Sequence, residues 1–144
     1  MSSMFIGCLS LKELNLNNFN TNNVTNMKSM FCRCSSLKEL NLNNFHTNNV
    51  VHMNAMFSRC SSIKELNLDN FNTYNAKYMS GMFSGCSSLK DLNISNFIID
   101  NVTNMSSMFS RCASLNDNVF DMSEMFNECF LLKELKIKNI KTLV

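Results

Sequence analysis

The side chains best suited to chemistry in this chain are its seven cysteines, twelve methionines and two histidines. Thiolate and thioether sulfur bind soft metals such as Cu(I), so a metal site is one hypothesis for them. The alternative is a core, in which free cysteine acts as a small apolar residue and methionine fills irregular gaps. Metal ligands must converge on one point, so the spacing of these residues decides between the two.

Cysteine and methionine recur in register with a 26-residue period. The cysteine column contains Cys8, Cys34, Cys60, Cys86, Cys112 and, after a shorter interval, Cys129. The methionines fill two further columns, which begin at Met1 and Met4. Residues in repeat register line up along a stack rather than around a point. We therefore expect core thiols and thioethers, no metal and no cofactor. An odd number of cysteines favours reduced thiols over disulfides.

The remaining candidates for chemistry fall outside these columns. His46 and His52 have no third orienting group in the pattern, so we interpret both as surface residues. Cys32 occupies a slot that serine fills in later units, and we expect it to point outward. Catalysis needs one irregular constellation, whereas this chain is regular almost throughout. We therefore expect no enzyme.

Composition excludes several other classes. With 45% hydrophobic residues and a net charge of +2, the chain is neither disordered nor polyionic. A lysine column at Lys12, Lys38, Lys64 and Lys90 lies beside an acidic one, so we expect no nucleic-acid partner. No apolar run approaches the ~18 residues of a membrane span. The start, MSSMFIGCLS, lacks the features of a signal peptide or a lipid anchor, so the compartment stays open.

Within one unit the periodicity changes. Leu40 and Leu42 alternate with polar residues, which predicts a strand with one buried face. After an asparagine-rich turn, Val50, Met53 and Phe57 follow at helical spacing. The small residues Ser3, Ser29, Ala55, Gly81 and Ser107 suggest close approach of neighbouring units, and Gly7 and Gly85 suggest a helix stop. The predicted fold is α/β: a right-handed, leucine-rich-repeat-like solenoid with one parallel sheet and short helices on the opposite face.

One repeat domain is expected to span residues 1–144. Its units start at Phe5, Phe31, Phe57, Phe83, Phe109 and Phe126. The unit at Phe109 is shortened: it lacks the nine residues equivalent to LNLNNFHTN, and therefore its strand. Helical segments are then predicted near 102–112 and 119–129. The strand at 133–138 is predicted to pair in parallel with 90–95, because an unpaired edge would leave backbone groups without partners. This gives about five strands.

The repeated unit resembles a known family. Its LxxLxLxxF core resembles the leucine-rich repeat, and the added VTNMxxMFxxCxSL segment makes it similar to the BspA-like leucine-rich repeat surface proteins, including those abundant in mycoplasma lipoproteins. The clearest unit is NVTNMKSMFCRCSSLKELNLNNF, residues 23–45. The resemblance implies a repeat fold and a role in adhesion or protein binding at the cell surface.

The residues that alternate with the buried leucines form the candidate binding surface. They are Glu13, Asn15, Asn17, Glu39, Asn41, Asn43, Glu65, Asn67, Asp69, Asp91, Asn93 and Ser95. Repeat stacks generally bind partners on such an extended face, although the asparagines could simply hydrogen-bond to one another along the stack. We expect a non-enzymatic scaffold that binds an unidentified protein, with a structural spacer as the alternative. Self-association through uncapped ends is a further possibility.

Overall fold

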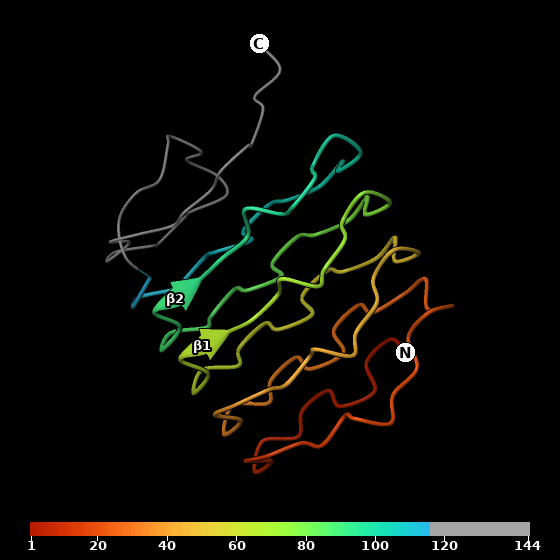
Figure 1. Cartoon of the computed structure of the whole chain (residues 1–144). Coiled ribbons are helices and arrows are strands. Elements are labelled where there is room, and N and C mark those ends of the chain that lie inside the picture. The colour runs from red at the N-terminus through yellow and green to blue at the C-terminus, as the bar shows by residue number, and fades with distance from the viewer. Residues whose placement is uncertain (116–144) are drawn as a thin grey trace.

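The computed structural model describes residues 1–115, in which the chain winds through successive coils that stack on one another (Figure 1). Each full coil takes 26 residues, so that equivalent residues of neighbouring coils lie side by side, as Asn26 and His52 do. We number the coils along the chain as coil 1 (1–26), coil 2 (27–52), coil 3 (53–78), coil 4 (79–104) and coil 5, described from 105 to 115.

The interior of the stack is filled by the apolar columns. Phe57, Met53 and Cys60 of coil 3 are fully buried, as are their equivalents in coil 2. The phenyl rings from Phe5 to Phe109 stack face to face, with centroids 5.6, 5.7, 5.7 and 5.4 Å apart. Burial of one such side chain is worth about 1.5–3 kcal/mol, and most of its contacts come from adjacent coils. The predicted core of thiols, thioethers and phenyl rings is confirmed for these coils.

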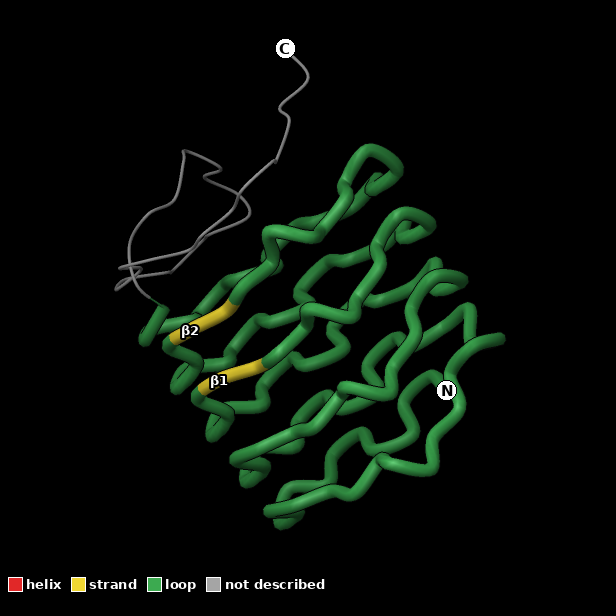
Figure 2. Tube along the Cα trace, in the orientation of Figure 1, coloured by secondary structure: helices red, strands yellow, loops and turns green. Residues whose placement is uncertain are grey.

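Regular secondary structure is sparse in residues 1–115 (Figure 2). Two strands of two residues each, β1 (Glu65–Leu66) and β2 (Asp91–Leu92), pair in parallel with Glu65 opposite Asp91. No helix occurs in this part of the chain. The predicted α/β solenoid, with about five strands and short helices on the opposite face, is therefore wrong.

The segment predicted to be helical folds instead as a run of tight turns. We call it the turn wall, residues 27–34 and their equivalents in the other coils. Ser29 and Arg33 have positive φ angles of 54° and 64°. Helical residues need φ near −63°, so two left-handed residues four apart leave no room for a helical turn. The same conformation recurs at Ser3, Gly7, Ala55, Arg59, Gly81, Gly85, Ser107 and Arg111.

The small residues do lie where neighbouring coils approach closely, as predicted: Ser29 N–H donates to the carbonyl of Asn54 in the next coil at 2.8 Å. Their φ angles add a second reason for their size. Ser3, Ser29, Ala55, Gly81 and Ser107 occupy a left-handed backbone position, which small side chains tolerate better than bulky ones. Gly7 and Gly85 mark a second left-handed turn position rather than a helix stop. The predicted helix at 102–112 is wrong for the same reason.

The backbone N–H groups of the turn wall donate alternately within their own coil and to the next coil. From Met30 to Cys34, every second N–H donates to the carbonyl three residues earlier in the same coil. The N–H groups between them donate to the next coil, as Phe31 does to the carbonyl of Met56 at 2.9 Å. All backbone donors of this segment are thus paired without a helix.

The strands are short because the asparagine that follows them bends the chain. Asn67 Oδ1 accepts the N–H of Asp69 at 2.8 Å, which is an Asx turn. The equivalent asparagines, Asn15, Asn41 and Asn93, accept in the same way. A backbone N–H bound to a side chain is not available to a sheet ladder, so pairing stops within two residues.

Side-chain ladders take over where the sheet ends. Asn70 Nδ2 donates to the carbonyl of Asn43 at 2.8 Å. The buried hydroxyl of Thr47 donates to the carbonyl of Asn72 at 2.9 Å and accepts the N–H of the same residue at 2.8 Å. The asparagines therefore bond mainly to the backbone of the preceding coil, not to one another. The predicted helix at 119–129, the strand at 133–138 and the unit at Phe126 lie outside the described residues.

Candidate functional site

A groove of about 680 Å³ crosses coils 2 to 4 on the face that carries β1. Three coils contribute equivalent side chains to it, so its chemistry repeats from coil to coil. Its lining residues are Lys38, Glu39, Leu40, Asn41, Ser62, Lys64, Glu65, Asn67 and Ser88. We call this the groove face, formed by residues 12–17, 38–43, 64–69 and 90–95.

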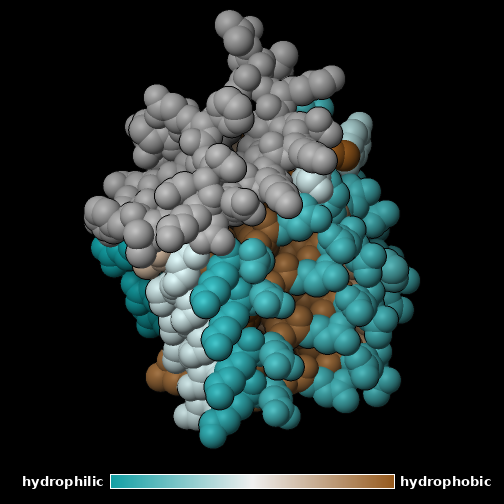
Figure 3. Space-filling model, turned by 60° about the vertical axis from the view of Figure 1, so that its left-hand side comes forward, coloured by the Kyte–Doolittle hydropathy of each residue, from teal (hydrophilic) through white to brown (hydrophobic). Residues whose placement is uncertain are grey.

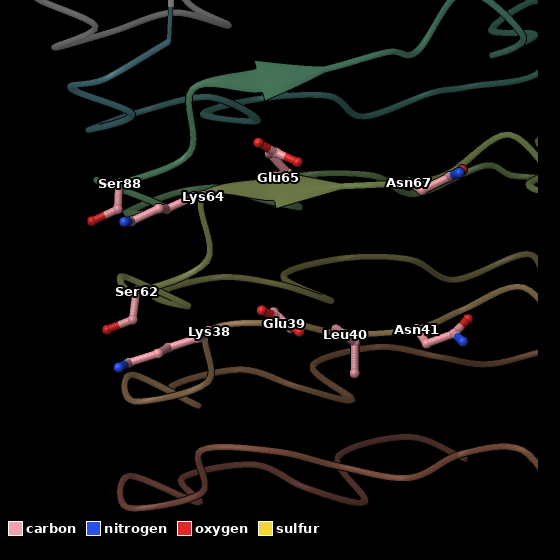
Figure 4. A pocket seen from close by; sticks show the side chains of 9 residues that line it. All are labelled: Lys38, Glu39, Leu40, Asn41, Ser62, Lys64, Glu65, Asn67 and Ser88. Atoms are coloured by element: carbon pink, nitrogen blue, oxygen red, sulfur yellow. The ribbon is translucent and has the colours of Figure 1, made fainter.

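The lining side chains are sorted across the groove by chemistry. Figure 4 shows the lysines beside the serines on one side, the two carboxylates in the middle and the asparagines on the other side. This order follows from the sequence Lys-Glu-Leu-Asn in each coil, because consecutive residues of an extended segment advance across the stack. A ligand in the groove would therefore meet ammonium, carboxylate and amide groups in fixed order.

The groove has an apolar element between its polar columns. Leu40 lines it and is 8% exposed, although its side chain belongs to the core. Figure 3 shows hydrophobic atoms in a strip between the hydrophilic columns of one face of the stack. An apolar strip with polar groups at fixed positions is typical of binding clefts.

The charges of the groove are not neutralised by one another. Within residues 1–115, neither Lys38 nor Lys64 forms an ion pair with a carboxylate, and Glu39 and Glu65 have no basic partner. Exposed pairs contribute only about 0–1 kcal/mol in any case. The groups are thus free to interact with a bound partner.

The predicted binding residues reach the surface but only some of them meet in the groove. Eleven of the twelve are exposed and Ser95 is partly buried. The groove brings together Glu39, Asn41, Glu65 and Asn67. The other eight, Glu13, Asn15, Asn17, Asn43, Asp69, Asp91, Asn93 and Ser95, do not line it.

The asparagines of the groove use their side-chain oxygen, but not their side-chain nitrogen, to stabilise the fold. Asn41 Oδ1 accepts the N–H of Asn43 at 3.0 Å, so its carbonyl oxygen holds an Asx turn. Its Nδ2 group, like that of Asn67, has no partner within residues 1–115. Each of these side chains can therefore donate to a ligand without disturbing the turn.

Sequence reasoning missed the lysines and serines of the groove. The lysine column was visible, but its neighbouring acidic column suggested a neutralised surface rather than a site. Ser62 and Ser88 precede the strand segment in each unit and carried no signal of their own. What the sequence could not show is that Ser62 of coil 3 lies beside Lys38 of coil 2.

Within residues 1–115, the cysteines of the column are free thiols that form a hydrogen-bonded ladder. Cys60 Sγ donates to the carbonyl of Phe31 at 3.1 Å, and Cys34, Cys86 and Cys112 donate to equivalent carbonyls. Burial, reinforced by the neighbouring thiols, raises the pKa of Cys34 to about 11 and that of Cys60 to about 12. Groups so hard to ionise are poor nucleophiles. Cys32, expected at the surface, is half-buried.

Other candidate groups show no converging chemistry. His46 is exposed, whereas the half-buried His52 stacks on Tyr78 with ring centroids 4.8 Å apart. In residues 1–115 no three metal-ligating side chains come together. The described part of the chain also contains no helix long and apolar enough to cross a membrane.

Comparison with known proteins places this repeat in a family. Residues 1–121 match a family described as Mycoplasma protein of unknown function, DUF285. No curated protein and no solved structure matches the chain. Because the match covers most of the 144 residues, the chain belongs to the DUF285 family of Mycoplasma proteins.

Proposed function

We propose that this chain is a non-enzymatic scaffold that binds a protein partner in the groove of coils 2 to 4. The observation that carries the proposal is the set of unpaired charges around an apolar strip. Lys38, Lys64, Glu39 and Glu65 repeat across the groove without ion pairs among residues 1–115. Charged groups in such an arrangement steer and orient a complementary partner more than they strengthen its binding.

The groove defines the chemistry of that partner. The occupant presents carboxylates toward the lysine column and basic groups toward the acidic column, at the coil spacing of about 4.8 Å. Amide donors at Asn41 and Asn67 add hydrogen bonds to carbonyl groups. An apolar side chain over Leu40 completes the contact.

A location for this activity follows from the likeness of the unit to BspA-like surface proteins. That likeness, carried by segments such as VTNMKSMFCRC, supports a role in adhesion at the cell surface.

Charge reversal with a matched control tests the proposal. The double variant Lys38→Glu and Lys64→Glu alters the groove, whereas Lys28→Glu and Lys77→Glu makes the same charge change at exposed positions elsewhere. Each immobilised protein is incubated with biotin-labelled surface proteins of cultured cells, and the captured proteins are identified by mass spectrometry. We expect wild type and the Lys28/Lys77 variant to capture a common partner that the Lys38/Lys64 variant loses.

A structural spacer would give a different result. It would capture the same background proteins in all three forms, because no face of it has a ligand. Equal capture by the three proteins would therefore contradict the scaffold and favour the spacer, in which the exposed asparagines serve only to hold neighbouring coils together.

A further inference from the structure

The corner of each inner coil, between the turn wall and the groove face, carries a repeated basic motif. The motif reads RCSSLK at residues 33–38, RCSSIK at 59–64 and GCSSLK at 85–90. Its cysteine and its leucine or isoleucine are buried and anchor the corner in the core. The three motifs contain five basic residues and no acidic one. We call these five residues and three serines the corner row: Arg33, Lys38, Arg59, Lys64, Lys90, Ser36, Ser62 and Ser88.

The basic groups of the corner row face solvent. All five basic side chains are exposed, and none of them forms an ion pair within residues 1–115. In Figure 4, Lys38 and Lys64 extend toward the corner and away from the two carboxylates of the groove. Positive charge is therefore concentrated along this edge of the stack, although the neighbouring residue in sequence is acidic.

Hydroxyl groups lie between the basic groups. Figure 4 shows Ser62 beside Lys38 and Ser88 beside Lys64. Both serines are partly exposed, and their hydroxyls form no hydrogen bond within residues 1–115. An anionic oxygen at either position can thus accept from an ammonium group and a hydroxyl together.

Packing between coils positions one arginine of the row. A Cβ at Gly85 would lie 3.2 Å from Arg59 Cγ, so the aliphatic stem of Arg59 lies over the glycine of the next coil. The stem is in contact with the protein while the side chain as a whole is exposed, which leaves the guanidinium group available. A guanidinium group offers parallel donors that match an anion with several oxygens.

We propose that the corner row binds a sulfated polysaccharide that lies along the axis of the stack. Successive coils repeat the basic groups about 4.8 Å apart, so the row is linear and suits a linear polyanion. Sulfate groups present only acceptors, and the row presents donors on guanidinium, hydroxyl and ammonium groups. This surface goes beyond the proposed function, because Arg33 and Arg59 do not line the groove, although Lys38 and Lys64 belong to both.

Two other polyanions fit the row less well. Proteins that lie on anionic lipid combine basic groups with apolar side chains that insert into the membrane. None of the large exposed hydrophobic residues of the described chain lies in the three motifs. Proteins that bind single-stranded nucleic acid stack its bases on aromatic side chains, and the motifs contain no aromatic residue.

Titration of a fluorescent heparin oligosaccharide with the 144-residue chain tests the proposal, with anisotropy as the readout. Arg33→Gln with Arg59→Gln removes two charges from the row, changes no groove residue and keeps the Cγ that packs on Gly85. Lys28→Gln with Lys77→Gln removes two charges from exposed positions outside the row. We expect saturable binding that the arginine variant weakens by about tenfold and the lysine variant by less than about twofold.

Three competitors identify the class of ligand. The same oligosaccharide without its sulfate groups should not displace the labelled one. Vesicles of phosphatidylcholine with phosphatidylserine, and a single-stranded oligonucleotide, should compete more weakly than unlabelled heparin at equal concentration of charge. Stronger competition by either of them, or equal competition by the desulfated chain, would overturn the sulfated polysaccharide as the ligand.

The variants decide whether the row is the site. Absence of saturable heparin binding, or equal affinities of the wild type and the arginine variant, would overturn the proposal. Equal losses in the arginine and lysine variants would show attraction by net charge alone and would overturn it as well. Because the arginine variant leaves the groove unchanged, either result is independent of whether the groove captures a protein partner.

Discussion

At the scale of single residues, the repeat assigns each side chain one physical task and repeats it in every coil. Thr47 holds the backbone of Asn72, Asn67 bends its own coil, and Cys60 fills the core while donating to Phe31. The cysteines lie in the core, where the neutral thiol is favoured over the charged thiolate. Their burial makes ionisation costly, and this has a measurable effect on stability.

The thiols should make the fold sensitive to alkali. An unfolded cysteine ionises near pH 9.0, whereas folding raises the pKa of Cys60 to about 12. The neutral thiol is therefore favoured by folding, and its contribution is complete below pH 9.0 and is lost as pH rises toward 12. We expect the free energy of unfolding to fall by about 1.4 kcal/mol per pH unit for each buried thiol in that interval.

Urea melts of wild type and Cys60→Ala at pH 8 and pH 10 measure this effect. The alanine variant should be less stable at pH 8 but should lose less stability on going to pH 10, because one titrating group has gone. Equal losses in the two proteins would mean that the Cys60 thiol ionises normally in the folded chain.

At the scale of elements, the structure is built from turns and ladders instead of helices and sheets. The threonine column forms a ladder in the interior: Thr21, Thr47 and Thr73 are fully buried and each pairs with one N–H and one carbonyl of the next coil. No apolar residue can serve both backbone groups.

Thr47→Val tests the ladder. Valine has the shape of threonine but leaves the N–H and the carbonyl of Asn72 without their partner, so we expect a loss of about 1–3 kcal/mol. Thr25→Val is the control, because Thr25 is exposed and should change stability by less than about 0.5 kcal/mol. Similar losses at both positions, measured by urea denaturation, would contradict the role of the hydroxyl.

The turn wall makes a second prediction through its left-handed glycines. Gly85 and Gly7 have φ angles of 76° and 74°, so alanine at either position costs about 1 kcal/mol in backbone strain. A Cβ at Gly85 would also lie 3.2 Å from Arg59 Cγ, whereas nothing lies within 4 Å at Gly7. Thermal unfolding should therefore show a larger loss for Gly85→Ala than for Gly7→Ala. Equal losses would mean that the Arg59 side chain does not pack against Gly85 as described.

These elements explain which features the sequence could predict. The period, the buried columns and the outward position of Glu39 and Asn41 follow from residue types and are confirmed. The helices were wrong because turns closed by bonds between residues three apart bring apolar side chains to one side with nearly helical spacing. The positive φ angles that exclude a helix occur at Ser29 and Arg33, and neither serine nor arginine predicts such angles.

The candidate site was predictable to a similar degree. Alternation with the buried leucines placed the acidic and amide columns on the surface, and four of their members do line the groove. That Lys38 and Ser62 line the groove together depends on how neighbouring coils abut, which a single unit does not reveal. The lysine and acidic columns, whose adjacency in the sequence suggested a neutralised surface, therefore remain able to contact a partner.

At the scale of the whole molecule, hydrogen bonds between the backbones of neighbouring coils set the register of the stack. Bonds such as Phe57 N–H to the carbonyl of Met82, at 2.9 Å, hold neighbouring coils in register, and this register lines up the columns of the groove. The proposed function therefore depends on the turn wall bonding between coils.

Scalar couplings across hydrogen bonds test this claim most directly. In a ¹⁵N,¹³C-labelled sample, a long-range HNCO experiment correlates the nitrogen of each donor with the carbonyl carbon of its acceptor. We predict a correlation from the amide of Phe57 to the carbonyl of Met82, and from that of Arg59 to Ser84. Correlations from Phe57 to Met53, four residues earlier in the same coil, would show a helix there and would contradict the account.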